Sequence, residues 1–111
     1  MDGLRLVKGN DFTTVIEVKA YKYNGEEITN FDLRQCTGIK IKCHINGDVQ
    51  DIQGFTVYDK TRLIISWDGP KMRIGGYSLE VCGKINNTDW RFYDKTPIFT
   101  IVNTNAEANI P

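Results

Sequence analysis

The chain has one histidine and three cysteines, the side chains that most often serve as bases, nucleophiles and metal ligands. A Ser-His-Asp or Cys-His mechanism would have to use His44, because no other imidazole is present. His44 follows Lys40 and Lys42 on the polar side of an alternating run, and the spacing brings no nucleophile against it. We therefore expect a solvated strand residue at His44, no catalytic residue and no enzymatic activity.

The three cysteines, Cys36, Cys43 and Cys82, lack the Cys-x-x-Cys spacing of metal and redox sites. Cys43 belongs to the inward-facing series of its predicted strand, whereas Cys82 belongs to the outward-facing series of another. Side chains that point to opposite sides of their sheets are poorly placed for a disulfide. We expect a small core residue at Cys43, a surface or edge thiol at Cys82, and a reducing compartment.

Oxygen-bearing side chains gather at one predicted hairpin, which contains Asn46, Asp48 and Asp51. Calcium takes roughly six to eight oxygen ligands, and the spacing here differs from that of an EF-hand loop. The chemistry of a tight turn accounts for these residue types without a metal. The sequence therefore predicts no metal and no cofactor.

Four aromatic residues are candidates for contact with a partner or ligand: Trp90, Tyr21, Tyr23 and Tyr93. Trp90 directly follows a polar turn, where an exposed ring would be able to stack on a sugar. Interleaved tyrosines and lysines are also typical of proteins that bind single-stranded nucleic acid. However, 14 basic and 14 acidic residues give a net charge of +0, so we expect no nucleic-acid partner.

A length of 111 residues allows one domain with a single core. Apolar residues make up 41% and charged residues 25%, as in ordinary globular proteins. The N-terminal residues do not resemble a signal peptide, and no apolar run approaches the roughly 18 residues of a membrane span. We expect a single domain over residues 1–102, a polar tail over residues 103–111, and no membrane insertion.

Short alternating segments separated by turn residues extend along the chain, and none has a helical period. The longest alternations cover residues 12–23, 37–45 and 77–85, and two shorter strands are expected over residues 90–94 and 98–102. This pattern predicts an all-β protein, an immunoglobulin-like antiparallel β-sandwich of about seven to nine strands. A small β-barrel with the same strands is the alternative.

Turn residues divide these strands at specific points. Asn24-Gly25 and Asn46-Gly47 are strong hairpin signals, because a type I′ turn needs positive φ at both central residues. Gly54 interrupts an alternating run and predicts a bulge or a break between two short strands.

The spacing Gly75-Gly76-Tyr77 has the form of a tyrosine corner. In this element a tyrosine at the start of a late sandwich strand hydrogen-bonds to the backbone a few residues upstream. We expect these three residues to join the two sheets and to have a structural role.

Three stretches, in their order along the chain, resemble an immunoglobulin-like domain of phage and prophage virion proteins. They are Val7-Lys8-Gly9-Asn10-Asp11, then Tyr23-Asn24-Gly25-Glu26-Glu27-Ile28 with Phe31-Asp32-Leu33, and Gly75-Gly76-Tyr77-Ser78-Leu79-Glu80-Val81. More narrowly, the chain is similar to the N-terminal domain of baseplate upper proteins over most of residues 4–102. Asn10 interrupts the usual Gly-Asp, Gly75 replaces a usual proline, and the coiled-coil or fibre region of such proteins is missing.

The resemblance implies a non-enzymatic structural or assembly module of a baseplate, tail or fibre attachment, which acts by protein-protein docking. Its partners would be other virion structural proteins, with a homo-oligomer expected. Its location would be the virion, after synthesis in the bacterial cytoplasm without a signal peptide. The alternative is a carbohydrate-binding or adhesive β-sandwich that uses Trp90 and the tyrosines.

Overall fold

The computed structural model describes residues 4–102, except for the side chains of Leu4 and residues 94–96. The predicted polar tail, residues 103–111, therefore lies outside the described residues. Between residues 4 and 102, nine strands and two short 3-10 helices follow one another: β1 (Leu4–Val7), β2 (Phe12–Glu17), β3 (Tyr21–Lys22), η1 (Leu33–Gln35), β4 (Thr37–Ile45), β5 (Asp48–Ile52), β6 (Phe55–Val57), β7 (Arg62–Trp67), η2 (Gly69–Lys71), β8 (Gly75–Ile85) and β9 (Thr88–Val102).

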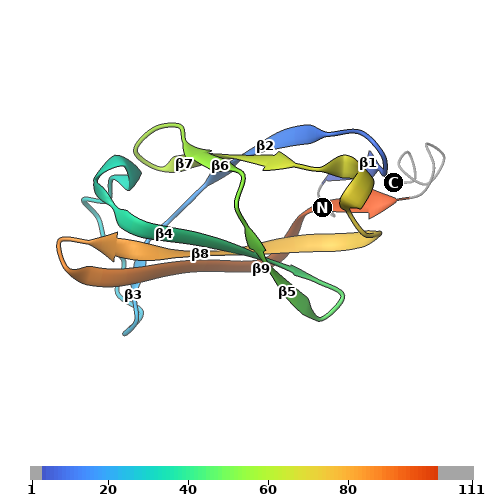
Figure 1. Ribbon diagram of the computed structural model, residues 1–111. Coiled ribbons are helices and arrows are strands. Elements are labelled where there is room, and N and C mark those ends of the chain that lie inside the picture. The colour runs from blue at the N-terminus through green and yellow to red at the C-terminus, as the bar shows by residue number, and fades with distance from the viewer. Residues whose placement is uncertain (1–3, 103–111) are drawn as a thin grey trace.

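The strands form two sheets that pack face to face as a sandwich (Figure 1). One sheet has three strands in the order β2-β7-β6, and the other has six, in the order β1-β9-β8-β4-β5 with β3 also paired to β9. All of these pairs are antiparallel except β1 with β9, which is parallel. The predicted all-β sandwich is confirmed, and no strand pairing between residues 4 and 102 joins the sheets into a barrel.

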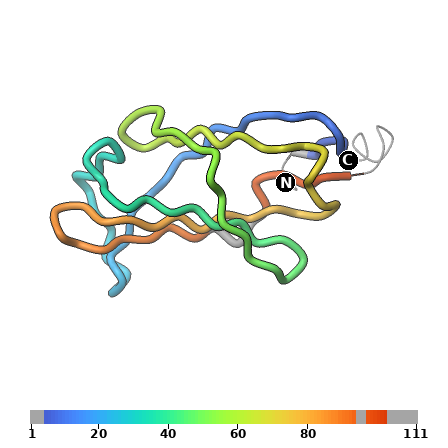
Figure 2. Tube along the Cα trace, viewed as in Figure 1, coloured from blue at the N-terminus to red at the C-terminus, as the bar shows by residue number. Residues whose placement is uncertain are grey.

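The alternation over residues 12–23, predicted as one strand, belongs to two strands in different sheets. β2 pairs with β7 in the three-stranded sheet, whereas β3 pairs with β9 in the six-stranded sheet. Between them the chain crosses from one layer to the other (Figure 2). Val18 and Ala20 on this crossing are each 1% exposed, so their side chains stay in the core and the period of two continues through the change of sheet.

A second difference concerns the end of the chain, where two predicted strands are one long strand, β9. Its register with β8 shifts between the pairs Tyr77↔Phe99 and Leu79↔Asp94, so β9 contains extra residues at this point. Pro97 lies in this bulge, where its missing N–H costs no ladder hydrogen bond. The predicted break at Gly54 is confirmed, because β5 and β6 belong to different sheets.

The turns follow the backbone preferences of their residues. Asn46 and Gly47 have φ values of 50° and 84°, as a type I′ turn between β4 and β5 requires. Asn86 and Asn87, with φ values of 49° and 63°, connect β8 to β9 in the same way. Asparagine tolerates this region better than most side chains.

Tyr77 is 3% exposed and its hydroxyl binds the backbone of Arg73 twice. The hydroxyl donates to the Arg73 carbonyl at 2.8 Å and accepts the Arg73 N–H at 2.7 Å. These bonds have the geometry of a tyrosine corner between β7 and β8. Burial raises the pKa of the Tyr77 hydroxyl above its usual 10.0.

The turn between β1 and β2 packs against this corner. A carboxylate oxygen of Asp11 accepts the N–H of Gly69 at 2.9 Å, and a Cβ at Gly69 would overlap the backbone carbonyl of Asn10. Glycine is therefore required at position 69 because two chain segments touch there. We refer to Asp11, Gly69, Arg73 and Tyr77 together as the corner.

The two tryptophans occupy the core in different ways. Trp67 stacks with Phe12 and meets Tyr77 and Phe99 edge to face, and its Nε1 donates to Thr14 Oγ1 at 2.9 Å. Trp90 is 0% exposed, and its Nε1 has no hydrogen-bond partner of ordinary geometry among the described residues.

Candidate functional site

The side of the six-stranded sheet that faces away from the core carries most of the residues singled out from the sequence. Alternation directs Ile41, Cys43, Leu79 and Val81 inward, so their neighbours along each strand point outward. We define the outer face by these outward residues of β3, β4, β8 and β9: Tyr21, Lys40, Lys42, His44, Ser78, Glu80, Cys82, Arg91 and Tyr93.

His44, Glu80 and Tyr93 form the centre of the outer face. His44 Nε2 lies 3.1 Å from Glu80 Oε1, and the imidazole stacks on the Tyr93 ring with centroids 4.9 Å apart and planes inclined by 27°. Tyr93 remains 44% exposed. Contacts within the face therefore hold its aromatic ring in place while one side of that ring stays available to a partner.

The hairpin that follows β3 forms one rim of the outer face. The guanidinium of Arg91 lies over the Tyr23 ring, 5.0 Å from its centroid, and Tyr23 is 62% exposed. Tyr21 pairs with Arg91 in the ladder, and a shallow depression of about 380 Å³ lies between Tyr21, Arg91, Tyr93 and Glu80. The structure thus brings the three predicted tyrosines to one surface.

Acidic residues stand beside the basic run of β4 in the sheet. Lys42 stands opposite Glu80 on β8 and opposite Asp51 on β5. At the rim of the outer face Lys22 pairs with Glu26 at 3.6 Å, and Arg62 belongs to the three-stranded sheet. The outer face is therefore mixed in charge, unlike a surface that tracks a phosphate backbone.

Ser78 stands opposite His44 in the β4–β8 ladder, so serine, histidine and glutamate share the outer face. A catalytic triad needs the nucleophile hydrogen-bonded to the base and donors for the developing oxyanion. The imidazole instead binds Glu80 and stacks on Tyr93. This arrangement orients an aromatic ring and a hydrogen-bonded histidine–glutamate pair on an open sheet.

Polar side chains of the β4–β5 hairpin tie these two strands to the segment around the corner. Asn46 donates to the carbonyl of Ile74 at 3.1 Å, and Asp48 forms an ion pair with Arg73 at 2.7 Å. Among the residues that the structure describes, no group of three or more histidine, cysteine, aspartate or glutamate side chains is placed to hold a metal ion.

The cysteines are free thiols in separate places. Cys43 is 1% exposed and burial raises the pKa of its thiol, whereas Cys82 is half-buried on the outer face. Cys36 donates to the carbonyl of Asp32 at 3.4 Å. Burial raises the pKa of the Cys36 thiol, and the nearby indole of Trp90 lowers it by a smaller amount. Sulfur is a weak hydrogen-bond acceptor, so the Cys36 thiol satisfies the Trp90 N–H poorly.

The expectation that Trp90 contacts a ligand or partner is wrong. Trp90 stands opposite Gly83 in the β8–β9 ladder and points inward, against the edge of Phe31 at a centroid distance of 4.8 Å. A Cβ at position 83 would come within 2.9 Å of the indole. Proximity to a turn suggested exposure, but the alternation of Trp90 and Phe92 with Arg91 and Tyr93 already indicated which pair faces the core.

Among the charged members of the outer face, sequence reasoning missed Glu80 and Arg91. Both are ordinary charged strand residues, and only the ladder positions beside Tyr93 and Tyr21 make them part of a site. No helix within residues 4–102 has the length and apolar character needed to cross a membrane. In comparisons with known proteins, no family model, curated protein or solved structure matches the chain.

Proposed function

We propose that the protein is a non-enzymatic docking module whose outer face binds another protein. The observation that carries the proposal is the group of Tyr93, Tyr23 and Arg91, placed on one open sheet surface by β9 and by the hairpin after β3. Tyrosine and arginine are enriched at the centres of protein interfaces. This composition suits recognition of a protein surface.

The contacts within the face support this function in a second way. The stacking of Tyr93 on His44 and the position of Arg91 over Tyr23 restrict the side chains before a partner arrives. An interface loses less conformational entropy on binding when its side chains are already ordered. The residues of the outer face belong to adjacent hydrogen-bonded strands, which keep the face rigid, as a structural module requires.

The resemblance of the sequence to baseplate-type domains leads us to propose phage or prophage virions as the setting. The partner would then be another structural protein of the baseplate, tail or fibre attachment, and the chain would be found in the particle. Fold alone is weak support for such a role, so the setting depends on the three stretches quoted from the sequence.

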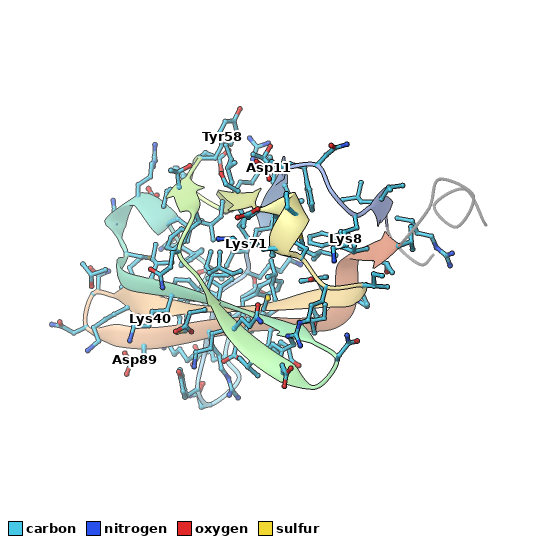
Figure 3. The ribbon with its side chains drawn as sticks, turned by 45° about the vertical axis from the view of Figure 1, so that its right-hand side comes forward. Lys8, Asp11, Lys40, Tyr58, Lys71 and Asp89 are labelled. Atoms are coloured by element: carbon cyan, nitrogen blue, oxygen red, sulfur yellow. The ribbon has the colours of Figure 1, made fainter. Side chains whose placement is uncertain are left out.

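A photo-crosslinking experiment tests the docking surface. A benzophenone amino acid is introduced at Tyr93, and a matched variant carries it at Tyr58, which is 57% exposed and has Arg62 over its ring. Tyr58 lies on the opposite side of the sandwich from Lys40 of the outer face (Figure 3). Virions purified after induction should contain the chain, and irradiation should crosslink it to a structural protein from Tyr93 only.

Particles that lack the chain would exclude the virion setting, and equal crosslinking from both positions would exclude the outer face as the docking surface. The carbohydrate alternative now depends on the exposed tyrosines alone, since Trp67 and Trp90 are 5% and 0% exposed. Binding to a defined glycan that Tyr93→Ala removes would favour that alternative.

A further inference from the structure

The outer edge of β2 pairs with no strand among residues 4–102, although β2 is the longest strand of its sheet together with β7. Its ladder with β7 is regular from Phe12↔Trp67 to Glu17↔Arg62. Sandwich domains normally protect such an edge by shortening it, by bending it or by placing charges or proline on it. β2 has six residues, no proline and one charged residue, Glu17.

The other edges show the usual protection. β6 has three residues and β1 has four, while β5 carries Asp48 and Asp51. Because an unprotected edge is a template for strand addition, the contrast points to β2 as a pairing surface.

The hydrogen bonds identify which backbone groups of this edge are available. The N–H of Val18 donates to the carbonyl of Thr61 at 2.7 Å, on the β7 side. Residues of an antiparallel strand alternate in the direction of their N–H and C=O groups. Thr13, Val15 and Glu17 therefore direct theirs toward the free edge.

A groove runs beside this edge and exposes part of the core. It has a volume of about 490 Å³ and lies between β2 and β9, with Leu79, Phe92 and Ile98 contributing apolar walls. Among residues 4–102, no strand pairs with the edge of β9 between Arg91, the last partner of β3, and Phe99, the first partner of β1. Val15 on β2 is 56% exposed.

We propose that β2 pairs with β2 of a second copy of this chain, antiparallel across a two-fold axis at Val15. In this register Val15 faces its own symmetry mate and Thr13 faces Glu17 of the other copy. The outward N–H and C=O groups of all three residues then exchange hydrogen bonds. The two three-stranded sheets become one continuous sheet, and the two grooves face each other.

Charge complementarity selects this register and this partner. Asp11 precedes β2 and Lys19 follows it, so in this register Asp11 of one copy and Lys19 of the other come to the same end of the paired segment, at both ends. The Asp11 carboxylate keeps its hydrogen bond to the Gly69 N–H. Lys19 is exposed and forms no ion pair with any residue in the described part of the chain. Moving the register two residues one way places Asp11 opposite Glu17, and like charges directly opposite are destabilising.

This homodimer goes beyond the proposed docking function, because it uses an edge of the other sheet and leaves the outer face free. A single strand pair buries less than the roughly 1,200 Å² of a stable interface, so we expect a weak, concentration-dependent dimer. A strand from a different protein would also fit the groove, but it would not require the self-complementary placement of Asp11 and Lys19.

Sedimentation equilibrium of the full chain from about 10 µM to about 1 mM tests the dimer. The mass should rise from 12.7 kDa toward twice that value. Val15→Lys should weaken association at least about tenfold by placing like charges at the axis. The matched control Val49→Lys changes a valine that is 53% exposed on β5, and it should leave association unchanged.

A cysteine scan tests the register in a Cys82→Ser background. Val15→Cys should form an intermolecular disulfide under mild oxidation, since directly paired Cα atoms lie about 5.5 Å apart. Thr13→Cys should not, because its symmetry mate is displaced by about 13 Å along the strand. A monomer at every concentration, equal weakening by Val49→Lys, or crosslinking at Thr13 instead of Val15 would each overturn the proposal. None of these outcomes would affect the Tyr93 crosslinking experiment.

Discussion

The corner and the β2 edge differ in where their backbone polar groups find partners. At the corner, the Tyr77 hydroxyl takes both the N–H and the C=O of Arg73, and Asp11 takes the N–H of Gly69. Along the β2 edge, the outward groups of Val15 and its neighbours meet no strand in the described structure. The corner is completed within the chain, whereas the edge is open to completion by another chain.

This difference predicts two classes of mutational effect. Substitutions at the corner should change the free energy of unfolding, because buried polar groups would lose their partners. Substitutions of exposed side chains at the β2 edge should change association and leave unfolding almost unaffected.

The largest effect is expected for Gly69→Ala. The added methyl group would overlap the backbone of Asn10, so the turn that carries Asp11 would have to move. We expect a loss of about 3 kcal/mol in the free energy of unfolding, measured by urea denaturation. Gly54→Ala is the matched control, because its Cβ would meet Ser66 at an ordinary 3.5 Å, and an equal loss there would contradict this account of the corner.

Tyr77→Phe should have the next largest effect. It keeps the ring stacked on Phe99 but leaves the N–H and C=O of Arg73 without the hydroxyl. We expect a loss of about 2 kcal/mol in the same assay. Tyr58→Phe, at an exposed position, should change stability little, and comparable losses for the two variants would show that the corner hydrogen bonds do not stabilise the fold.

Thr14→Val tests a residue of β2 whose side chain points to the core. The substitution preserves shape but removes the acceptor of Trp67 Nε1, so we expect a loss of about 1 kcal/mol. Thr13→Val, one residue away on the exposed side, should cost nothing measurable. If both substitutions had the same effect, the Trp67 hydrogen bond would not explain the difference between the two sides of β2.

Alkaline pH should weaken the corner through the Tyr77 hydroxyl. Its pKa is raised above 10.0 by burial, so the unfolded chain loses this proton at lower pH than the folded chain. The stabilisation is fully present below pH 10.0 and is lost as pH rises through the folded pKa. The loss of unfolding free energy caused by Tyr77→Phe should therefore become smaller in urea titrations above pH 10.0. A loss that stays constant with pH would contradict a stabilising role of the protonated Tyr77 hydroxyl.

The smallest effect on stability is expected at the β2 edge. Val15→Thr keeps a β-branched side chain at a position that is 56% exposed, so unfolding should change by less than about 0.5 kcal/mol. A larger loss in thermal or urea unfolding would mean that Val15 already packs within the monomer.

Much of the sandwich was predictable because strand residues alternate between core and solvent. The inward series of β4 and β8, including Cys43 and Val81, was correct, and so was the break at Gly54. Trp90 was misjudged because its position after a turn was given more weight than its phase in the strand. The sequence singled out Tyr21 and Tyr93 of the outer face and Tyr23 at its rim, but not the charged neighbours Glu80 and Arg91.

The amino-acid sequence by itself determined which side chains point inward, where hairpins turn, and that a tyrosine follows Gly75-Gly76. Only the tertiary structure decided that residues 12–23 belong to two sheets, that His44 meets Glu80 and Tyr93, and that no strand among residues 4–102 pairs with the free edge of β2. The physical reason is that a two-residue hydrophobic period specifies which face of a strand is buried. It does not specify which other strands lie beside that strand in the sheet. Backbone hydrogen bonds are alike at every residue, so neighbouring strands are chosen by packing between distant segments.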